Sequence, residues 1–296
     1  MRNLLILAVS AAALAACGQP APTEPQLPVP EGEVTPPAPV PGSLELLWTA
    51  SGFETPEGAA LAPGGGYFIS NIGPGPEDAR DGNGYISKLN ADGSLASAKF
   101  AVGMDAPAGL TVMDGVLYAA DRDGVALFDA ATGEAKGKVL IEGAGFLNDM
   151  TVWKGDVLVS DSGTATIHKI TLESASVFAA SEGWAGINGI LGDGDRLLIT
   201  TMTEGKLIDF RGPDAETVIA AGMVDADGVG LVPGGGYLVS SWPGEIHHVS
   251  ADGVATKLID TKEAGILQND LSVFEDIVIV PNWTPGTVTA WKVVGE

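Results

Sequence analysis

The chain is poor in cysteine, in basic residues and in helical sequence patterns. Cys17 is the only cysteine, so no disulfide can form within the chain. The 15 lysines and arginines face 38 aspartates and glutamates, which gives a formal net charge of −23. Nucleic-acid binding needs clustered lysine and arginine, so we expect no nucleic-acid partner. No stretch of the folded part shows a sustained helical period, and helix is therefore expected to be a minor element.

Residues 1–16 have the pattern of a bacterial lipoprotein signal peptide. Arg2 supplies a positive start, residues 4–16 are apolar, and small residues precede Cys17. The apolar run is too short for a comfortable membrane span. The pattern resembles a lipobox, in which Cys17 becomes the lipidated first residue; a plain signal peptide is the alternative. Gly18, rather than aspartate, follows the cysteine, which favours the outer membrane in the lipoprotein pattern.

Residues 17–42 are expected to form an extended tether, because nine prolines fall between Gly18 and Gly42. The remaining residues, 43–296, have no break in composition and are expected to form one domain. We therefore expect a protein of the bacterial cell envelope, lipid-anchored at the outer membrane and facing the periplasm or the exterior. The lipid is the only membrane contact expected, and the protein is expected to be a monomer.

A short polar step opens a strand-like run six times along the domain. The middle residues of these steps are separated by 51, 40, 40, 39 and 42 positions. Repeats of 40 to 45 residues with four strands each are typical of propeller blades. The steps are Pro56-Glu57-Gly58, Pro107-Ala108-Gly109, Leu147-Asn148-Asp149, Ile187-Asn188-Gly189, Ala226-Asp227-Gly228 and Gln268-Asn269-Asp270.

Each repeat contains short β-rich runs separated by Gly, Asp and Pro, as in hairpins. The sixth repeat ends at Glu296 without a fourth strand, and Leu44 to Thr49 can supply it. Such pairing removes the open edges that a linear sheet would leave. The sequence therefore predicts an all-β fold, a six-bladed β-propeller closed by an N-terminal strand.

The middle residues of the six steps are expected to face one another at one end of the central tunnel. Their side chains offer only carboxylate and amide oxygens, which suit hard divalent cations. We expect one such cation, Ca²⁺ first, with Mg²⁺, Mn²⁺ and Zn²⁺ as alternatives. The alternative is that these steps are ordinary turns, because Asn-Gly and Asp-Gly are common turn dipeptides. The residues in chain order are Glu57, Ala108, Asn148, Asn188, Asp227 and Asn269.

From about Glu54 to Lys292 the pattern resembles the senescence-marker-protein, gluconolactonase and luciferin-regenerating-enzyme family of six-bladed propellers, which includes regucalcin. The resemblance rests on Pro56-Glu57-Gly58, Asn148-Asp149, Asn188-Gly189 and Asp227-Gly228. It implies that Glu57, Asn188 and Asp227 bind one divalent cation. It also implies that Asp227 acts as the base and that Asn148 contacts substrate or water. Asn269 is a further candidate for orienting substrate.

One position departs from the family. Sugar-lactone members carry an arginine two residues before the third-blade asparagine, whereas this chain has Phe146. The difference argues against an aldonolactone and favours a more apolar substrate. The three histidines (His168, His247 and His248) fall in expected third strands and are interpreted as ordinary strand residues.

Other residues near the expected tunnel mouth have weaker signals. The long loop at residues 73–84 is either a lid with Arg80 as a polar contact or a solvated surface loop. Trp242 and Asn282 end second strands and are expected to line the mouth. Asp121 and Asp161 also end second strands, and the plain interpretation is that they cap turns.

Two functions remain open at this stage. One is a divalent-cation-dependent hydrolase that acts on a small-molecule lactone or related ester. The other is a non-catalytic propeller that binds a ligand or protein and holds a structural cation.

Overall fold

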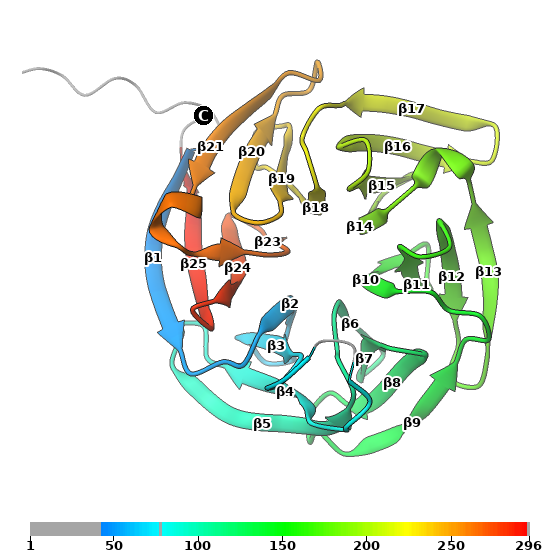
Figure 1. Cartoon of the computed structure of the whole chain (residues 1–296), viewed down its shortest axis with the longest axis vertical. Coiled ribbons are helices and arrows are strands. Elements are labelled where there is room, and N and C mark those ends of the chain that lie inside the picture. The colour runs from blue at the N-terminus through cyan, green and yellow to red at the C-terminus, as the bar shows by residue number, and fades with distance from the viewer. Residues whose placement is uncertain (1–42, 77–78, 295–296) are drawn as a thin grey trace, which may run out of the picture. The chain divides into compact units, whose positions relative to one another are not determined.

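The computed structural model describes residues 43–76 and 79–294. The predictions for Cys17, the signal peptide and the tether lie outside these residues. Six antiparallel sheets form a ring, with the first strand of each sheet next to the centre (Figure 1). The six-bladed propeller is therefore confirmed. The described residues contain no α-helix and only two short 3₁₀ helices, η1 (Glu182–Trp184) and η2 (Lys262–Ala264). No helix within those ranges is long and apolar enough to cross a membrane.

Blades 1 to 5 each contain four consecutive strands, because short turns with Gly, Asp or Asn connect adjacent β-rich runs. Blade 1 contains β2 (Pro56–Leu61), β3 (Tyr67–Asn71), β4 (Gly84–Leu89) and β5 (Leu95–Met104), and blade 2 contains β6 (Leu110–Met113), β7 (Val116–Asp121), β8 (Gly124–Asp129) and β9 (Ala135–Leu140). Blade 3 contains β10 (Leu147–Trp153), β11 (Asp156–Asp161), β12 (Thr166–Ile170) and β13 (Ala175–Ala180). Blade 4 contains β14 (Ile187–Asp193), β15 (Arg196–Thr201), β16 (Lys206–Gly212) and β17 (Ala215–Ala220), and blade 5 contains β18 (Ala226–Leu231), β19 (Tyr237–Ser241), β20 (Glu245–Val249) and β21 (Ala255–Asp260).

Blade 6 is assembled from the two ends of the domain. Its inner position is divided into β22 (Leu267–Gln268) and β23 (Ser272–Phe274), and both pair with β24 (Ile277–Thr284). Next come β25 (Thr287–Val294) and then β1 (Ser43–Ser51), which pairs antiparallel to β25 with Ser43 opposite Val294. In Figure 1 the blue β1 lies beside the red β25. The predicted closure of the ring by an N-terminal strand is confirmed.

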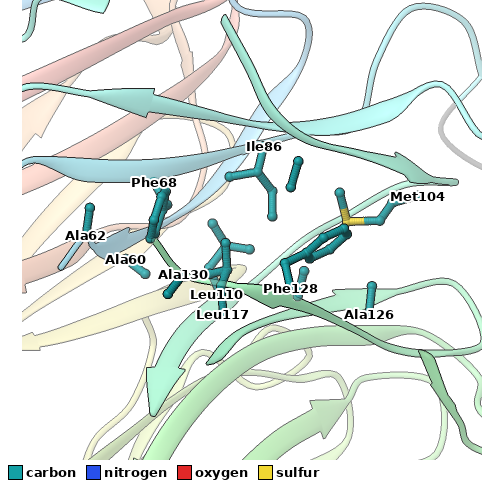
Figure 2. Packing of buried hydrophobic residues seen from close by; sticks show 12 residues of the cluster. Ala60, Ala62, Phe68, Ile86, Met104, Leu110, Leu117, Ala126, Phe128 and Ala130 are labelled. Carbon is teal, nitrogen blue, oxygen red and sulfur yellow. The ribbon is translucent and has the colours of Figure 1, made fainter. Parts of the chain in front are cut away.

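The hydrophobic core is divided among the six interfaces between neighbouring blades. One buried cluster of the described residues lies at each interface. Figure 2 shows the cluster between blades 1 and 2, where Phe68, Ile86 and Leu117 are fully buried. Alternating side chains of both sheets meet face to face there, as in other packed sheets. Each blade therefore depends on both of its neighbours, and the ring positions the inner strands rigidly.

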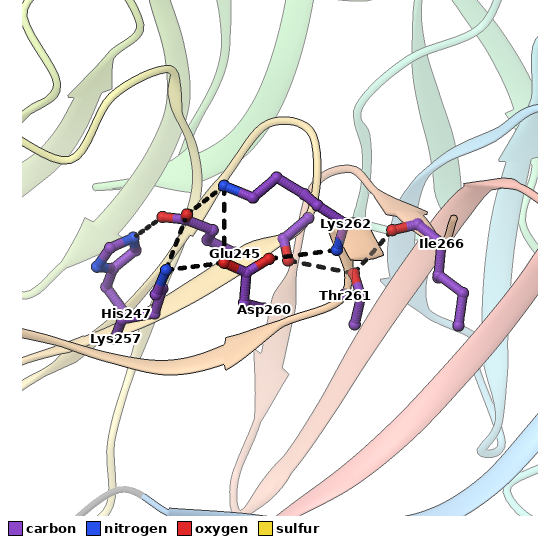
Figure 3. A network of polar contacts seen from close by, with 8 residues as sticks. Glu245, His247, Lys257, Asp260, Thr261, Lys262 and Ile266 are labelled. Carbon is purple, nitrogen blue, oxygen red and sulfur yellow. Dashed lines mark hydrogen bonds and ion pairs between the residues drawn. The ribbon is translucent and has the colours of Figure 1, made fainter. Parts of the chain in front are cut away.

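A polar network fixes the outer part of blade 5 to the connection that leads into blade 6. Glu245 accepts hydrogen bonds from His247, Lys257 and Lys262 (Figure 3). Lys257 also donates to Asp260 across 2.7 Å. These groups are mostly exposed, so we expect the network to order the β21–η2 segment more than to stabilise the fold. Thr261 continues it by donating to the carbonyl of Ile266 at 2.7 Å.

Candidate functional site

A β-bulge interrupts the inner strand at the polar step in blades 1, 3, 4 and 5. In blade 1, Pro56 pairs with Asn71 and the next paired residue is Ala59, so Glu57 and Gly58 lie in the bulge. Corresponding shifts occur in the other three blades. A bulge bends the strand and redirects a side chain. In these four blades the bulge turns one residue toward the central axis.

Hydroxyl groups of the second strands satisfy the backbone groups that the bulges leave unpaired. The N–H groups of Gly58 and Gly228 donate to Ser70 and Ser240, each at 2.8 Å. Asp149 N–H donates to Ser160 at 3.0 Å in the same way. Because a buried unpaired N–H is costly, these serines stabilise the bulged conformation. The same support is thus found in blades 1, 3 and 5.

The six middle residues of the steps, hereafter the axial set, line one cavity of about 300 Å³. The prediction that these six positions meet at one end of the tunnel is therefore confirmed. The five polar members are all buried, with Asp227 only 2% exposed. The axial set comprises Glu57, Ala108, Asn148, Asn188, Asp227 and Asn269.

A second periodic set lines the same cavity and was missed in the sequence analysis. In each blade, the first residue of the polar step faces a residue near the end of the second strand, and the member of this set is the next residue in the chain. In blade 1, for example, Pro56 faces Asn71 and the member is Ile72. Successive members are separated by 50, 40, 40, 40 and 41 positions. Five of its six members line the cavity, while the Ser162 hydroxyl donates to the Ile187 carbonyl instead. We call those five residues the wall set. They are Ile72, Arg122, Met202, Trp242 and Trp283.

The prediction for Trp242 is confirmed, and the prediction for Asn282 is wrong. Asn282 is fully buried and does not line the cavity; its amide donates to Thr287 at 3.0 Å. Asn282 pairs in register with Gln268, so the residue equivalent to Trp242 is the next one, Trp283. The two tryptophan rings meet edge to face with centroids 5.6 Å apart.

Two aspartates occupy the third position of the step, where the other four blades have glycine. Asp149 of blade 3 accepts from Ile190 N–H of blade 4 at 2.8 Å. Asp270 of blade 6 lies against Gly228 of blade 5. Burial raises the pKa of Asp149 to about 7. Burial, followed by the charges of Asp149, Asp227 and Glu57, raises the pKa of Asp270 well above its ordinary range.

The donor chemistry of the axial set fits a hard cation. Asp227 Oδ1 is buried and has no hydrogen-bond partner among the described residues. Burial, then the charges of Asp149 and Asp225, raises the pKa of Asp227 to about 7. A positive charge near this carboxylate would stabilise its ionised form and offset the cost of burying it. The ranges described contain no cluster of three or more His, Cys, Asp or Glu side chains suited to a metal. The axial set supplies two carboxylates, with amides as its other oxygen donors.

Asp121 and Asp161 hold the loops that precede the first strands of their blades, as their plain interpretation predicted. Asp161 accepts from Gly145 N–H at 3.0 Å and from Phe146 N–H at 2.8 Å. Burial raises the pKa of Asp161, but the His168 ring and these backbone donors outweigh it and hold the pKa well below its usual range. Asp121 accepts from Ala106 N–H at 2.8 Å in the corresponding place. Ala106, Phe146 and Leu147 complete the cavity lining.

The histidines lie in third strands, as expected, and none of them lines the cavity. His168 Nε2 lies 3.6 Å from Asp161 Oδ2, behind the loop that carries Phe146. Arg80 is also absent from the cavity lining, and it pairs instead with Asp123 at 2.8 Å. Phe146 does line the cavity, and the Arg122 guanidinium lies 5.7 Å from the centre of its ring.

No protein-family model matches the chain, and no curated protein sequence matches it. Solved structures share the fold at low sequence identity. A gluconolactonase from Xanthomonas campestris superposes with a TM-score of 0.64 and 15% identity, covering 85% of this chain and 89% of its own. Regucalcin from Agrobacterium tumefaciens, described as a calcium-binding protein, superposes with a TM-score of 0.62 and 17% identity over 86% of this chain and 96% of its own.

A virginiamycin B lyase from Staphylococcus aureus superposes with a TM-score of 0.57 and 10% identity, covering 85% of this chain and 100% of its own. The lyase in that structure is a catalytically inactive histidine-to-alanine variant. These likenesses show that the chain has the propeller fold of gluconolactonase, regucalcin and virginiamycin B lyase.

Proposed function

We propose that the protein is a divalent-cation-dependent hydrolase of the gluconolactonase-like family that acts on a lactone or related ester. The observation that carries this proposal is the convergence of the axial set on one cavity. Two carboxylates and three amides gather there, and all five side chains are buried. The gluconolactonase and regucalcin neighbours agree with a lactonase-like propeller.

Glu57, Asn188 and Asp227 would hold the cation, with Ca²⁺ as the first choice and Mg²⁺, Mn²⁺ or Zn²⁺ as alternatives. Three protein ligands leave places for water and substrate around Ca²⁺, which takes six to eight oxygens. When bound, the cation would polarise the ester carbonyl and lower the pKa of a water molecule. All three side chains are buried at the cavity, with exposures of 6%, 4% and 2%.

Asp227 is the residue we assign to proton transfer. Its carboxylate would take a proton from the attacking water and return it to the leaving alkoxide. Burial raises the pKa of this carboxylate in the cation-free protein, and a bound cation would lower it again, so the lowered pKa of the water would share the proton transfer. Asn148 and Asn269 would orient the substrate or the water by hydrogen bonds from their amides. These two side chains are 5% and 7% exposed and line the cavity.

The apolar wall favours an apolar lactone over a sugar lactone. Phe146, Trp242 and Trp283 present aromatic surface to the cavity, and sugar hydroxyls would find few partners there. A lyase reaction is less well supported. The lyase neighbour is inactive when a histidine is replaced by alanine, whereas no histidine is present among the cavity-lining residues described here.

The test is hydrolysis of a panel of lactones and aryl esters by the purified protein, with each of the four cations and after chelation. We expect cation-dependent hydrolysis of at least one apolar lactone, and its loss in the Asp227→Ala variant. No cation-dependent activity, or equal activity in the variant, would refute the hydrolase. A cation that raises only the melting temperature would support the alternative of a ligand- or protein-binding propeller with a structural cation.

We further propose that Cys17 anchors the protein to the bacterial cell envelope through a lipid. The signal pattern and the proline-rich residues that follow support this proposal. Labelled fatty acid should be incorporated into the expressed chain and lost in the Cys17→Ser variant. Incorporation into that variant, or none into the parent, would contradict it.

A further inference from the structure

Among the fourteen described residues that line the cavity, Arg122 alone is cationic. It belongs to the wall set and follows the last residue of β7. Its side chain is half-buried, and its Nε is buried without a hydrogen-bond partner in the described part of the chain. Its guanidinium lies over the face of Phe146, 5.7 Å from the ring centre.

The carboxylates adjacent to Arg122 in the sequence are already paired with other cations. Asp121 accepts from Lys138 at 2.8 Å and from two backbone N–H groups. Asp123 pairs with Arg80 at 2.8 Å and with Lys138 at 2.5 Å. Among residues 43–76 and 79–294, no carboxylate forms an ion pair with Arg122. An arginine that faces a cavity in this way is available to an anion from outside.

We infer that Arg122 binds a carboxylate carried by the substrate, so that the substrate class is an apolar, ring-containing lactone or ester with one acidic group. This inference rests on the proposed function, because it specifies the substrate of the same site. The guanidinium presents a planar fork that matches a carboxylate in a bidentate contact. Phe146 holds the fork in place by stacking, and its ring provides the apolar surface beside it.

The other residues of the cavity and its volume indicate the charge, shape and size of the substrate. A dianionic phosphate would face Glu57 and Asp227 with one guanidinium as its sole cationic side chain, so a monoanionic carboxylate is the better match. The edge-to-face tryptophan pair, Trp242 and Trp283, offers an apolar wall to a ring. The volume of about 300 Å³ lies at the small end for small-molecule sites, which suits a compact substrate.

The first measurement is binding and does not depend on turnover. Isothermal titration after chelation compares 3-phenylpropionate with its uncharged analogue 3-phenylpropionamide. We expect the wild-type protein to bind the carboxylate roughly 10- to 100-fold more tightly, the range of a charge-assisted contact. The Arg122→Met variant should lose this preference. Arg122→Lys should keep part of it, because lysine retains the charge but lacks the fork.

The matched control is Arg211→Met, which removes the same charge from an exposed residue paired with Asp209 and absent from the cavity. This control should keep the wild-type preference. Melting temperatures of both methionine variants should equal that of the parent to within a few degrees, because neither arginine is buried in the core. An equal affinity of the wild-type protein for carboxylate and amide would overturn the inference. So would a preference that survives in Arg122→Met.

The second measurement separates this inference from the proposed function. Dihydrocoumarin and a carboxylated dihydrocoumarin are compared as substrates of the parent and of Arg122→Met with Ca²⁺ present. We expect the variant to lose kcat/KM for the carboxylated lactone only. Arg122-dependent carboxylate binding without hydrolysis of either lactone would refute the hydrolase while leaving Arg122 as the anion-binding residue. Hydrolysis with no Arg122-dependent preference would overturn the inference alone.

Discussion

The carboxylate of Asp270 occupies the space that a side chain on Gly228 would need. A Cβ at Gly228 would lie 1.9 Å from Asp270 Oδ1 and 2.5 Å from the backbone nitrogen of Leu271. Blades 5 and 6 therefore meet at a position where one residue is acidic and the other has no side chain. Gly228→Ala is expected to force the two inner strands apart and to destabilise the protein by about 2–4 kcal/mol. Urea unfolding measures the change.

Gly183→Ala is the matched control for that substitution. A Cβ at Gly183 would meet only the Ser181 hydroxyl, at 3.3 Å, and this side chain can move. The control should change the free energy of unfolding by less than about 1 kcal/mol. If both variants were equally stable, the close packing of blades 5 and 6 would not be the reason for glycine at position 228.

Asp227→Asn should abolish the effect of the cation on stability and activity together. We expect Ca²⁺ to raise the melting temperature of the parent and to have no effect on the variant, because a ligand stabilises only the state that binds it. Hydrolysis should fall at least about 100-fold with the loss of the base. The comparison variant is Asp225→Asn, two residues away, which removes a charge that acts on Asp227 but no proposed ligand, so it should keep the cation-dependent rise in melting temperature. An Asp227→Asn variant that kept the cation-dependent shift would exclude Asp227 as a ligand.

Asp161→Asn is expected to loosen the loop that carries Phe146 and to do so in a pH-dependent way. The pKa of Asp161 is lower in the folded than in the unfolded protein. The charged Asp161 carboxylate therefore stabilises the fold at pH values above its unfolded pKa of about 3.9, and this stabilisation is lost as the pH falls toward its folded pKa. We expect the variant to be less stable by about 2–3 kcal/mol at pH 7. The difference should shrink below about pH 4.

Urea unfolding at several pH values tests this, with Asp156→Asn as control. Asp156 pairs with Lys169 at 2.7 Å on the surface of the same blade, so its loss should cost less than about 1 kcal/mol. A difference between Asp161→Asn and the parent that did not change with pH would show that the charge of Asp161 is not what orders the loop.

Asp149→Asn should have the opposite pH dependence in the absence of divalent cations. The folded-state pKa of Asp149 is raised to about 7, mainly by burial. The protonated Asp149 side chain therefore contributes fully to the stability of the fold below the unfolded pKa of about 3.9, and this contribution is lost as the pH rises toward 7. The parent should thus weaken relative to the variant by about 2–3 kcal/mol between pH 5 and pH 8. Thermal melts after chelation measure this, and parallel curves for the two proteins would contradict it.

The axial set was predictable because its residues share both spacing and chemistry. Four of these residues, Glu57, Asn148, Asn188 and Asp227, lie in a bulge of the inner strand, and all six recur with the blade period, so a regular repeat in the sequence marks a regular position in space. The ring closure was predictable because the last repeat lacked a strand that residues near 44 could supply. Hydrophobic periodicity and turn residues carried these predictions without any knowledge of packing between blades.

The wall set was not predictable in the same way, because its members have spacing but no common chemistry. Isoleucine, arginine, methionine and tryptophan at equivalent positions do not suggest a shared site. Asn282 was chosen over Trp283 because β24 extends to Thr284, and the sequence does not show which residue of a strand pairs with the inner strand. A one-residue error of this kind moves a side chain to the opposite face. Arg122 was missed because the pairing of its acidic neighbours is visible only in three dimensions.

The bulge that recurs in the inner strands makes the bottom of this cavity modular. Each blade contributes one axial residue, and in blades 1, 3 and 5 a serine of the second strand supports the backbone at this position, so the axial side chain can be replaced without a change of register. Blade 2 contributes Ala108, which leaves one of the six positions without a polar group. A carboxylate or an imidazole introduced there would face the other five. Single substitutions at the six axial positions, each on a separate sheet, thus offer a route to new metal selectivity in an otherwise unchanged scaffold.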